Sequence, residues 1–258
     1  MLNGMDFLKT ATNPRLIAVA LRRLFPWRAA RHDQECRHLI SAWSSGRLPR
    51  LPLAALFPGI ANTDVLLRKA ESRAVGWSLD LQELVHLLSI VKFTRPKVIL
   101  EIGTFDGFTA LNLAANVETD AEVRTLDLPQ NLDSAEIKAK GISNAWINDR
   151  RGEKFLSEPE AIRIRQLWGD SLKADWNTFG PPFDLILIDG AHEYPYVRSD
   201  SLNALQSIRP GGTILWHDYG QCLGVSRAVD ELAVDKPIRA IKGTRFACLR
   251  VPTSHPGH

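Results

Sequence analysis

The chain has 258 residues, of which 45% are hydrophobic and 24% are charged, and its net charge is +3. These are the proportions of an ordinary globular protein, and they exclude a disordered chain and a collagen-like one. No stretch approaches the roughly 18 uncharged apolar residues that are needed to cross a bilayer, which excludes a membrane-spanning helix.

Basic residues are concentrated near the start of the chain. Residues 1–70 contain 11 Lys and Arg against 4 Asp and Glu, whereas the rest of the chain contains 21 against 25. This split predicts a basic N-terminal extension at residues 1–70 and a mildly acidic domain at residues 71–258. Residues 14–39 mix apolar side chains with arginines. We expect a helix there that packs on the domain as a lid or on a second subunit of a homodimer, and not on a membrane.

The three cysteines, Cys36, Cys222 and Cys248, are scattered and include no CxxC pair. An odd number without metal-ligand spacing argues against a disulfide framework and against a zinc site, and it indicates a reducing compartment. The apolar run at residues 16–21 is too short for a secretory leader. We therefore expect a cytoplasmic protein.

From residue 80 onward, helical and strand patterns alternate. Asp80 is a candidate N-cap for a helix that ends before Pro96. We predict strands at residues 98–102, 122–126, 164–168, 183–188 and 213–216, with helices near residues 109–117 and 196–208. Residues 238–241 and 246–251 predict a closing hairpin, whose strands are antiparallel. The pattern predicts an α/β fold with a doubly wound, mostly parallel sheet that is covered by helices on both faces.

The loop after the first strand carries the strongest motif, Glu-Ile-Gly-Thr-Phe-Asp-Gly-Phe-Thr at residues 101–109. Gly103 and Gly107 allow a tight turn and close approach of a ligand. A nicotinamide cofactor would need a glycine where Phe105 stands, and Asp106 would repel its phosphates. S-adenosylmethionine has no phosphate and carries an ammonium and a sulfonium, so an acidic loop favours it. Two glycines also suit an ordinary strand–helix turn, so this loop alone does not decide the function.

Two further strand ends add weaker signals. Asp127 follows the second strand, where an acid can accept both hydrogen bonds of a ribose diol. Gly169, Asp170 and Ser171 follow the third strand, where a short Asp can meet an adenine amino group. Each is also a common cap or turn. The predicted cofactor contacts are Glu101, Gly103, Thr104, Phe105, Gly107, Asp127, Leu128, Gly169, Asp170, Ser171 and Asp189.

These segments, together with Phe183-Asp-Leu-Ile-Leu-Ile-Asp-Gly190 and Arg209-Pro-Gly-Gly-Thr-Ile-Leu-Trp-His-Asp218, follow each other in the order seen in class I S-adenosylmethionine-dependent methyltransferases. The chain resembles the small-molecule O-methyltransferases of the catechol and caffeoyl-CoA type and their bacterial relatives that act on sugars and secondary metabolites. The resemblance covers about residues 75–251. It implies a Rossmann-like, seven-stranded sheet with an antiparallel last strand, S-adenosylmethionine as cofactor, and a small-molecule hydroxyl as methyl acceptor.

Two neighbouring strand ends are expected to carry the chemistry. Asp189 ends the fourth strand, and His217 and Asp218 end the fifth, so their side chains should open into one crevice. The resemblance implies that acids at these positions hold Mg²⁺, which lowers the pKa of the substrate hydroxyl; the predicted metal set is Asp189, His217 and Asp218. His217 departs from that pattern, because Mg²⁺ prefers oxygen ligands, whereas imidazole suits zinc, manganese or iron.

The alternative is metal-free. His192 or His217 would then take the substrate proton as general base, so the predicted catalytic residues are Asp189, His192 and His217. Either histidine could instead have a purely structural role.

Two other functions are less favoured. Methylation of nucleic acid or protein is disfavoured because Asp-Gly-Ala-His follows the fourth strand in place of an Asn/Asp-Pro-Pro-aromatic segment. A domain that binds the cofactor without using it is disfavoured by the presence of Asp189, His192, His217 and Asp218 together.

Overall fold

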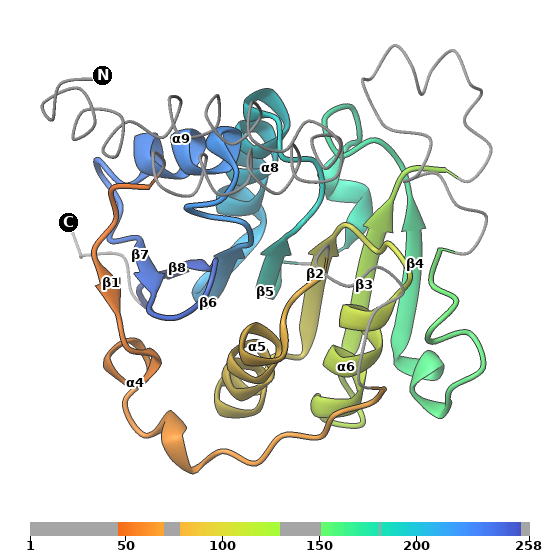
Figure 1. The fold of residues 1–258 in the computed structure, drawn as a ribbon. Helices are drawn as coiled ribbons and strands as arrows, with labels where there is room; N and C mark the ends of the chain where they lie inside the picture. The colour runs from red at the N-terminus through yellow and green to blue at the C-terminus, as the bar shows by residue number, and fades with distance from the viewer. Residues whose placement is uncertain (1–45, 70–77, 130–150, 181, 254–258) are drawn as a thin grey trace, which may run out of the picture.

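A computed structural model describes residues 46–69, 78–129, 151–180 and 182–253. In this part of the chain an eight-stranded sheet lies between two pairs of helices (Figure 1). The strand order is β1-β7-β8-β6-β5-β2-β3-β4. The helix predicted at residues 14–39 lies outside the described residues.

The sheet is parallel except for β8, which runs antiparallel to both β6 and β7. Its strands are β1 (Arg50–Leu51), β2 (Val98–Ile102), β3 (Glu122–Asp127), β4 (Ile164–Trp168), β5 (Phe183–Ile188), β6 (Ile208–Trp216), β7 (Arg239–Ile241) and β8 (Ala247–Arg250). The predicted α/β fold with a mostly parallel sheet and a closing antiparallel hairpin is confirmed. The eighth strand is β1, which is too short for a sequence pattern to reveal.

Helices cover both faces of the sheet. The longer ones are α5 (Leu81–Thr94), α6 (Phe108–Asn116), α8 (Tyr194–Ser207) and α9 (Leu223–Leu232), and the short ones are α4 (Leu53–Leu56), η1 (Ile60–Asn62), η3 (Pro159–Arg163) and η4 (Trp176–Phe179). Side chains alternate along β2: Ile99 packs with α5 and α6, whereas Leu100 packs with α8 and α9. The central strands are apolar along their whole length because both of their faces are buried.

The described part of the predicted extension packs on the predicted domain. The strand β1 pairs with β7, and α4 and η1 then lead the chain toward α6 (Figure 1). There the backbone N–H of Leu66 donates to Asn116 and that of Arg68 donates to Asn112, each at 2.8 Å. Residues 46–69 therefore follow the sheet from its β1 edge to α6. The domain boundary at residue 70 stays a prediction.

The order in which the chain adds strands to the sheet reverses between β2 and β5: β3 and β4 lie on one side of β2, and β5 and β6 lie on the other. The helix α6, which follows β2, covers one face, and α8, which follows β5, covers the other, although the two strands are neighbours. In doubly wound sheets a crevice opens at such a point, outside the carboxyl ends of the two strands. The loops after β2 and β5 are therefore expected to form the binding site.

Candidate active site

Gly103 allows the ends of β2 and β5 to lie close together. Its φ angle is +106°, and a Cβ atom at this position would lie 2.2 Å from the backbone oxygen of Asp189. In the same place the N–H of Asp189 donates to the oxygen of Ile102 at 2.9 Å. Only glycine fits such a close approach with a positive φ angle.

A pocket opens at this junction. It is lined by Ser78, Gly103, Thr104, Phe105, Asp106, Thr109, Asp189, Gly190 and His192. Five of the predicted site residues thus meet in one place: Gly103, Thr104, Phe105, Asp189 and His192. They come from the loops after β2 and β5, as the position of the switch point predicts.

The pocket loop, which is the segment at residues 103–107 between β2 and α6, is surrounded by carboxyl groups. Glu101 is fully buried at the end of β2, and Thr125 donates to its Oε2. Its Oε1 has no hydrogen-bond partner among the described residues. Burial raises the pKa of Glu101 well above its usual value, and the charges of Asp189, Asp127 and Asp106 add to the effect. Glu101 does not line the pocket, but four carboxyl groups so close together disfavour an anionic ligand at this loop.

Asp127 holds the pocket loop in shape. Its carboxylate accepts hydrogen bonds from the backbone N–H groups of Phe105 at 2.9 Å and Leu128 at 2.7 Å, and Arg151 Nε lies 3.5 Å away. Burial raises its pKa, although these contacts oppose the shift. Asp127 does not line the pocket. Its predicted contact with a ribose therefore stays a prediction.

The predicted adenine contacts lie further along the same sheet edge. The N–H of Gly169 donates to the backbone oxygen of Asp127 at 2.9 Å, and the backbone oxygen of Asp170 accepts from Lys173 and Ala174 in the turn that follows. Gly169, Asp170 and Ser171 do not line the pocket. Residues 130–150, which follow β3, lie outside the described part of the chain.

His217 lies behind the pocket between two carboxylates. Its Nδ1 is 2.8 Å from Asp189 Oδ1, and its Nε2 is 3.1 Å from Glu83 Oε2. The side chain is 1% exposed. Burial alone would lower the pKa of His217, but the charges of Asp189 and Asp218 and the two hydrogen bonds raise it to about 10. An imidazole whose two nitrogens both face carboxylate oxygens is a cation that donates twice.

Arg245, in the turn between β7 and β8, completes this buried cluster. Its Nε donates to Glu83 Oε1 at 2.9 Å, and one terminal nitrogen donates to Asp218 Oδ1 at 2.8 Å. Burial alone would raise the pKa of Glu83, but the hydrogen bonds from His217 and Arg245 lower it to about 2. The pKa of Asp218 is also lowered, against the effect of burial, mainly by the charge of His217 and the hydrogen bond from His192.

The predicted metal set does come together, since ligand atoms of Asp189, His217 and Asp218 all lie within 4.8 Å of one another. The Oδ1 atoms of both carboxylates, however, already face a protein cation: His217 contacts Asp189 Oδ1, and Arg245 contacts Asp218 Oδ1. Mg²⁺ prefers an octahedron of oxygen ligands. A guanidinium on one carboxylate and an imidazole on the other do not fit that requirement.

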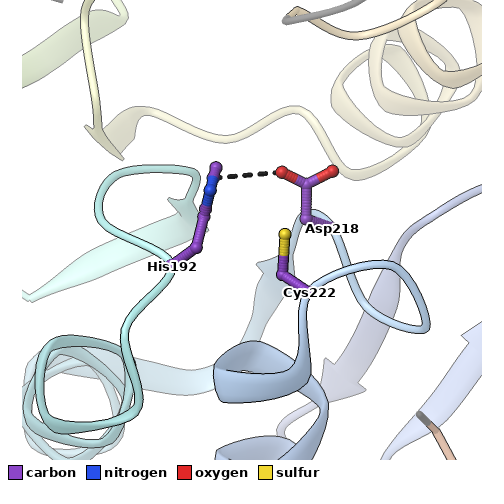
Figure 2. Close-up of side chains that lie close together, drawn as sticks. All are labelled: His192, Asp218 and Cys222. Atoms are coloured by element: carbon purple, nitrogen blue, oxygen red, sulfur yellow. Dashed lines mark ion pairs between the residues drawn. The ribbon is translucent and has the colours of Figure 1, made fainter. Parts of the chain in front are cut away.

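His192 is the histidine that reaches the pocket. It stands in the loop between β5 and α8, and its Nε2 lies 3.0 Å from Asp218 Oδ2 (Figure 2). Burial alone would lower the pKa of His192, but the hydrogen bonds and charges of Asp218 and Cys222 raise it well above its usual value. Asp218 has a φ angle of +57°, so its backbone is held in a left-handed turn. Its two oxygens point to different partners, Oδ1 to Arg245 and Oδ2 to His192.

Glu83, Arg245 and Cys222 belong to the site although the sequence did not indicate them. Glu83 accepts the backbone N–H of Asp80 in the capping box of α5, which is the role that its spacing suggests. Arg245 is 162 positions away from Glu83, and only the closing hairpin brings the two together. For Arg245, the available signal was its position as a charged residue just before the apolar strand β8.

The sequence comparisons support the resemblance. A family model described as a methyltransferase domain matches residues 100–219. This stretch contains every predicted strand-end residue from Glu101 to Asp218, and the match confirms the expected similarity to methyltransferases. No match was found among the curated proteins. Within the described residues, no helix is long and apolar enough to span a membrane.

Solved structures of O-methyltransferases are similar to the chain. The O-methyltransferase TomG from Streptomyces achromogenes, in complex with S-adenosylmethionine, has 19% sequence identity and a TM-score of 0.47, with 70% of this chain and 83% of that chain covered. The O-methyltransferase from Bacillus cereus, in complex with S-adenosylhomocysteine, has 20% identity and a TM-score of 0.47, with 68% and 83% covered.

Proposed function

We propose that this chain is an enzyme that transfers a methyl group from S-adenosylmethionine to a hydroxyl of a small molecule, with His192 as the general base. The observation that carries the proposal is the pocket at the switch point. Its lining combines the glycine loop after β2, with Asp106, and the loop after β5, with Asp189 and His192. The match of residues 100–219 to a methyltransferase domain supports the same chemistry.

The loop after β2 is suited to a cationic cofactor. Gly103 leaves room for close approach, Asp106 and Asp189 place carboxyl groups in the pocket lining, and Asp127 holds the loop through Phe105. S-adenosylmethionine, when bound, supplies a methyl group on a positively charged sulfur. The task of the protein is then to align the acceptor oxygen with that methyl group and to remove its proton.

His192 and Asp218 form the pair that would remove this proton. Because Asp218 raises the pKa of His192, the base is the neutral form that becomes populated as the pH rises. That form donates its Nε2–H to Asp218 and keeps a lone pair on Nδ1. Arg245 and the buried turn fix Asp218, and therefore the ring of His192. His217, which does not line the pocket and has both nitrogens engaged, would position Asp189. No step of this mechanism passes through a metal ion.

Calorimetry tests the cofactor. We expect S-adenosylmethionine and S-adenosylhomocysteine to bind and NAD not to bind. Asp127→Asn should weaken S-adenosylmethionine binding by about 1–2 kcal/mol, because the loop loses a charged acceptor for two backbone hydrogen bonds. Asp235→Asn, which changes an exposed carboxylate, is the control and should bind like the parent. Binding of NAD in place of S-adenosylmethionine would refute the proposal.

Transfer of a labelled methyl group to a panel of sugars, phenols and polyketides tests the reaction. His192→Ala should lower the turnover about 10²-fold or more while the affinity for S-adenosylmethionine stays unchanged. Exhaustive chelation should leave activity intact. Loss of activity on chelation, with recovery on adding magnesium, would replace the histidine base by a metal mechanism. Binding without transfer to any acceptor would favour a non-catalytic domain.

We also propose that the protein is cytoplasmic, because its cysteines are scattered and unpaired in the sequence pattern. We propose that the basic N-terminal segment packs on the domain or on a second subunit. Light scattering on the full chain and on a chain that lacks residues 1–45 would show whether that segment makes a homodimer. If both forms have the same number of subunits, the segment does not mediate dimerisation.

A further inference from the structure

A second group of metal-ligand atoms lies on the other side of Asp218. His192, Asp218 and Cys222 each offer one donor atom, and these atoms all lie within 4.8 Å of one another. Figure 2 shows the imidazole of His192 facing the carboxylate of Asp218, with the thiol of Cys222 beside them. The cluster uses Oδ2 of Asp218, whereas Arg245 and His217 face Oδ1. It is therefore a donor set distinct from the predicted magnesium set.

Three different elements hold these donors. His192 stands in the loop before α8, Asp218 follows β6, and Cys222 is the N-cap of α9. The backbone oxygen of Asp218 accepts from the N–H groups of Cys222 at 2.9 Å and Gln221 at 3.1 Å. One tight turn therefore fixes Asp218 relative to Cys222.

The loop that carries His192 is packed directly on the first turn of α9. A Cβ atom at Gly224 would lie 2.3 Å from the backbone oxygen of His192 and 2.6 Å from the backbone nitrogen of Tyr194. The guanidinium of Arg227, one turn further along α9, lies 4.1 Å from the centre of the Tyr194 ring. The position of His192 relative to Cys222 is thus set by backbone packing, which is how a metal site is preorganised.

The donor chemistry selects a borderline ion. The cysteine spacing argues against a zinc site, but donors that come from three separate elements need no spacing motif. Imidazole and thiolate are ligands that Zn²⁺ prefers, whereas Mg²⁺ prefers oxygen alone. Two ligands about 2.0 Å from a tetrahedral zinc ion lie about 3.3 Å apart. The observed separation of His192 Nε2 and Asp218 Oδ2, 3.0 Å, is already close to that value. The N-terminus of α9 also favours the negative charge of a bound thiolate at Cys222.

We propose that His192 Nε2, Asp218 Oδ2 and Cys222 Sγ form a binding site for Zn²⁺ or a chemically similar divalent ion. Binding releases the proton that His192 and Asp218 share and the proton of the thiol, and the ion takes their place. Three protein ligands leave a fourth tetrahedral position for water or a ligand. Because His192 lines the pocket, the site adjoins the pocket.

A consequence follows for catalysis, and it rests on the proposed function. An imidazole that is bound to a metal through Nε2 carries its remaining proton on Nδ1, and it has no lone pair with which to accept another. Zinc and the histidine base therefore exclude each other. Saturating Zn²⁺ should inhibit methyl transfer reversibly, and chelation should restore it.

Cobalt binding tests the site independently of activity. Titration of the purified full chain with Co²⁺, under reducing conditions and without cofactor, should give one equivalent of binding. It should also give a near-ultraviolet absorption band from the thiolate–cobalt bond, which Zn²⁺ abolishes by competition. Cys222→Ser and Cys222→Ala should lose the band and bind the ion at least tenfold more weakly, and His192→Ala should bind it at least tenfold more weakly.

Two other cysteines provide matched controls. Cys36→Ser and Cys248→Ala remove a thiol elsewhere in the chain and should keep both the band and the affinity. Thermal melts would confirm that each variant is folded, and calorimetry with S-adenosylmethionine reports on the proposed function separately. No thiolate band in the parent, or the same band in Cys222→Ala, would overturn the site even if S-adenosylmethionine binds normally. Equal sensitivity of the parent and Cys222→Ala to zinc would overturn the inhibitory consequence.

Discussion

Glu83 serves two purposes that the sequence does not separate. Its spacing from Asp80 is that of a capping box, and both hydrogen bonds of that box are present at the start of α5. The same carboxylate is fully buried, and it accepts hydrogen bonds from both His217 and Arg245. The capping role alone would not require Glu83 to contact His217 and Arg245. The second role is therefore what makes this position costly to change.

Glu83→Gln should lower the free energy of unfolding by about 3 kcal/mol, because His217 and Arg245 each lose one of their carboxylate partners while the shape of the side chain is preserved. Urea denaturation, followed by circular dichroism, measures this change. Glu158→Gln is the control, because its carboxylate pairs with Arg68 and Lys69 near the surface, and its midpoint should not move. A loss below about 1 kcal/mol for Glu83→Gln would show that the cluster does not depend on its charge.

At the scale of elements, the interior of the sheet was predictable and its edge was not. The apolar runs of β2 and β5 are typical of strands that are buried on both faces, and Gly243 indicated the β7–β8 hairpin. The strand β1 has two residues and no pattern of its own, and it exists because β7 offers a free edge. The helix α9 was not predicted either, although Cys222 at its N-cap lies beside His192 and Asp218.

The distribution of the site residues along the chain explains the rest. The acids and glycines at strand ends can be placed from the sequence, because all parallel strands present their carboxyl ends at one edge of the sheet. Contacts such as Glu83 with Arg245 depend on how distant loops fold over that edge. No spacing rule connects residues that are so far apart.

Tyr219 ties the start of the described chain to the sheet. Its hydroxyl accepts the N–H of Leu48 at 2.8 Å and donates to Asp230 Oδ1 at 2.6 Å, and Asp230 also accepts the N–H of Arg47. Tyr219→Phe removes this bridge. We expect trypsin to cleave after Arg47 and Arg50 at least several times faster in the variant, because the edge segment opens more often.

Mass spectrometry of the timed digest gives this result residue by residue. Tyr194→Phe is a matched control, because it also removes a tyrosine hydroxyl that binds a carboxylate, that of Glu231, but on the exposed side of α8 and α9. Its cleavage after Arg47 and Arg50 should match the parent. Equal cleavage in all three proteins would mean that the β1–β7 pairing alone holds the segment.

At the scale of the whole molecule, the balance of protons between the folded and unfolded states sets the pH dependence of stability. Asp200 on α8 is fully buried. Burial raises its pKa from 3.8 to about 7, and the charge of Asp170 adds to the shift, whereas the nearby Ser171 side chain opposes it. Between about pH 4 and pH 7 the folded state therefore holds a proton that the unfolded state has lost. The contribution of this group to stability is present at low pH, and it is lost as the pH rises through 7.

Asp200→Asn should remove that dependence, because the amide stays neutral at every pH. Near pH 5 the variant should be more stable than the parent by about 1–2 kcal/mol. At pH 8, where the parent must ionise a buried carboxyl group, the variant should be more stable by on the order of 4 kcal/mol. Urea denaturation at pH 5, 6, 7 and 8 measures the two slopes, and Asp235→Asn, an exposed carboxylate, should follow the parent throughout. Parallel curves for the parent and Asp200→Asn would show that Asp200 ionises in the folded state without cost, and that its surroundings at α8 admit water.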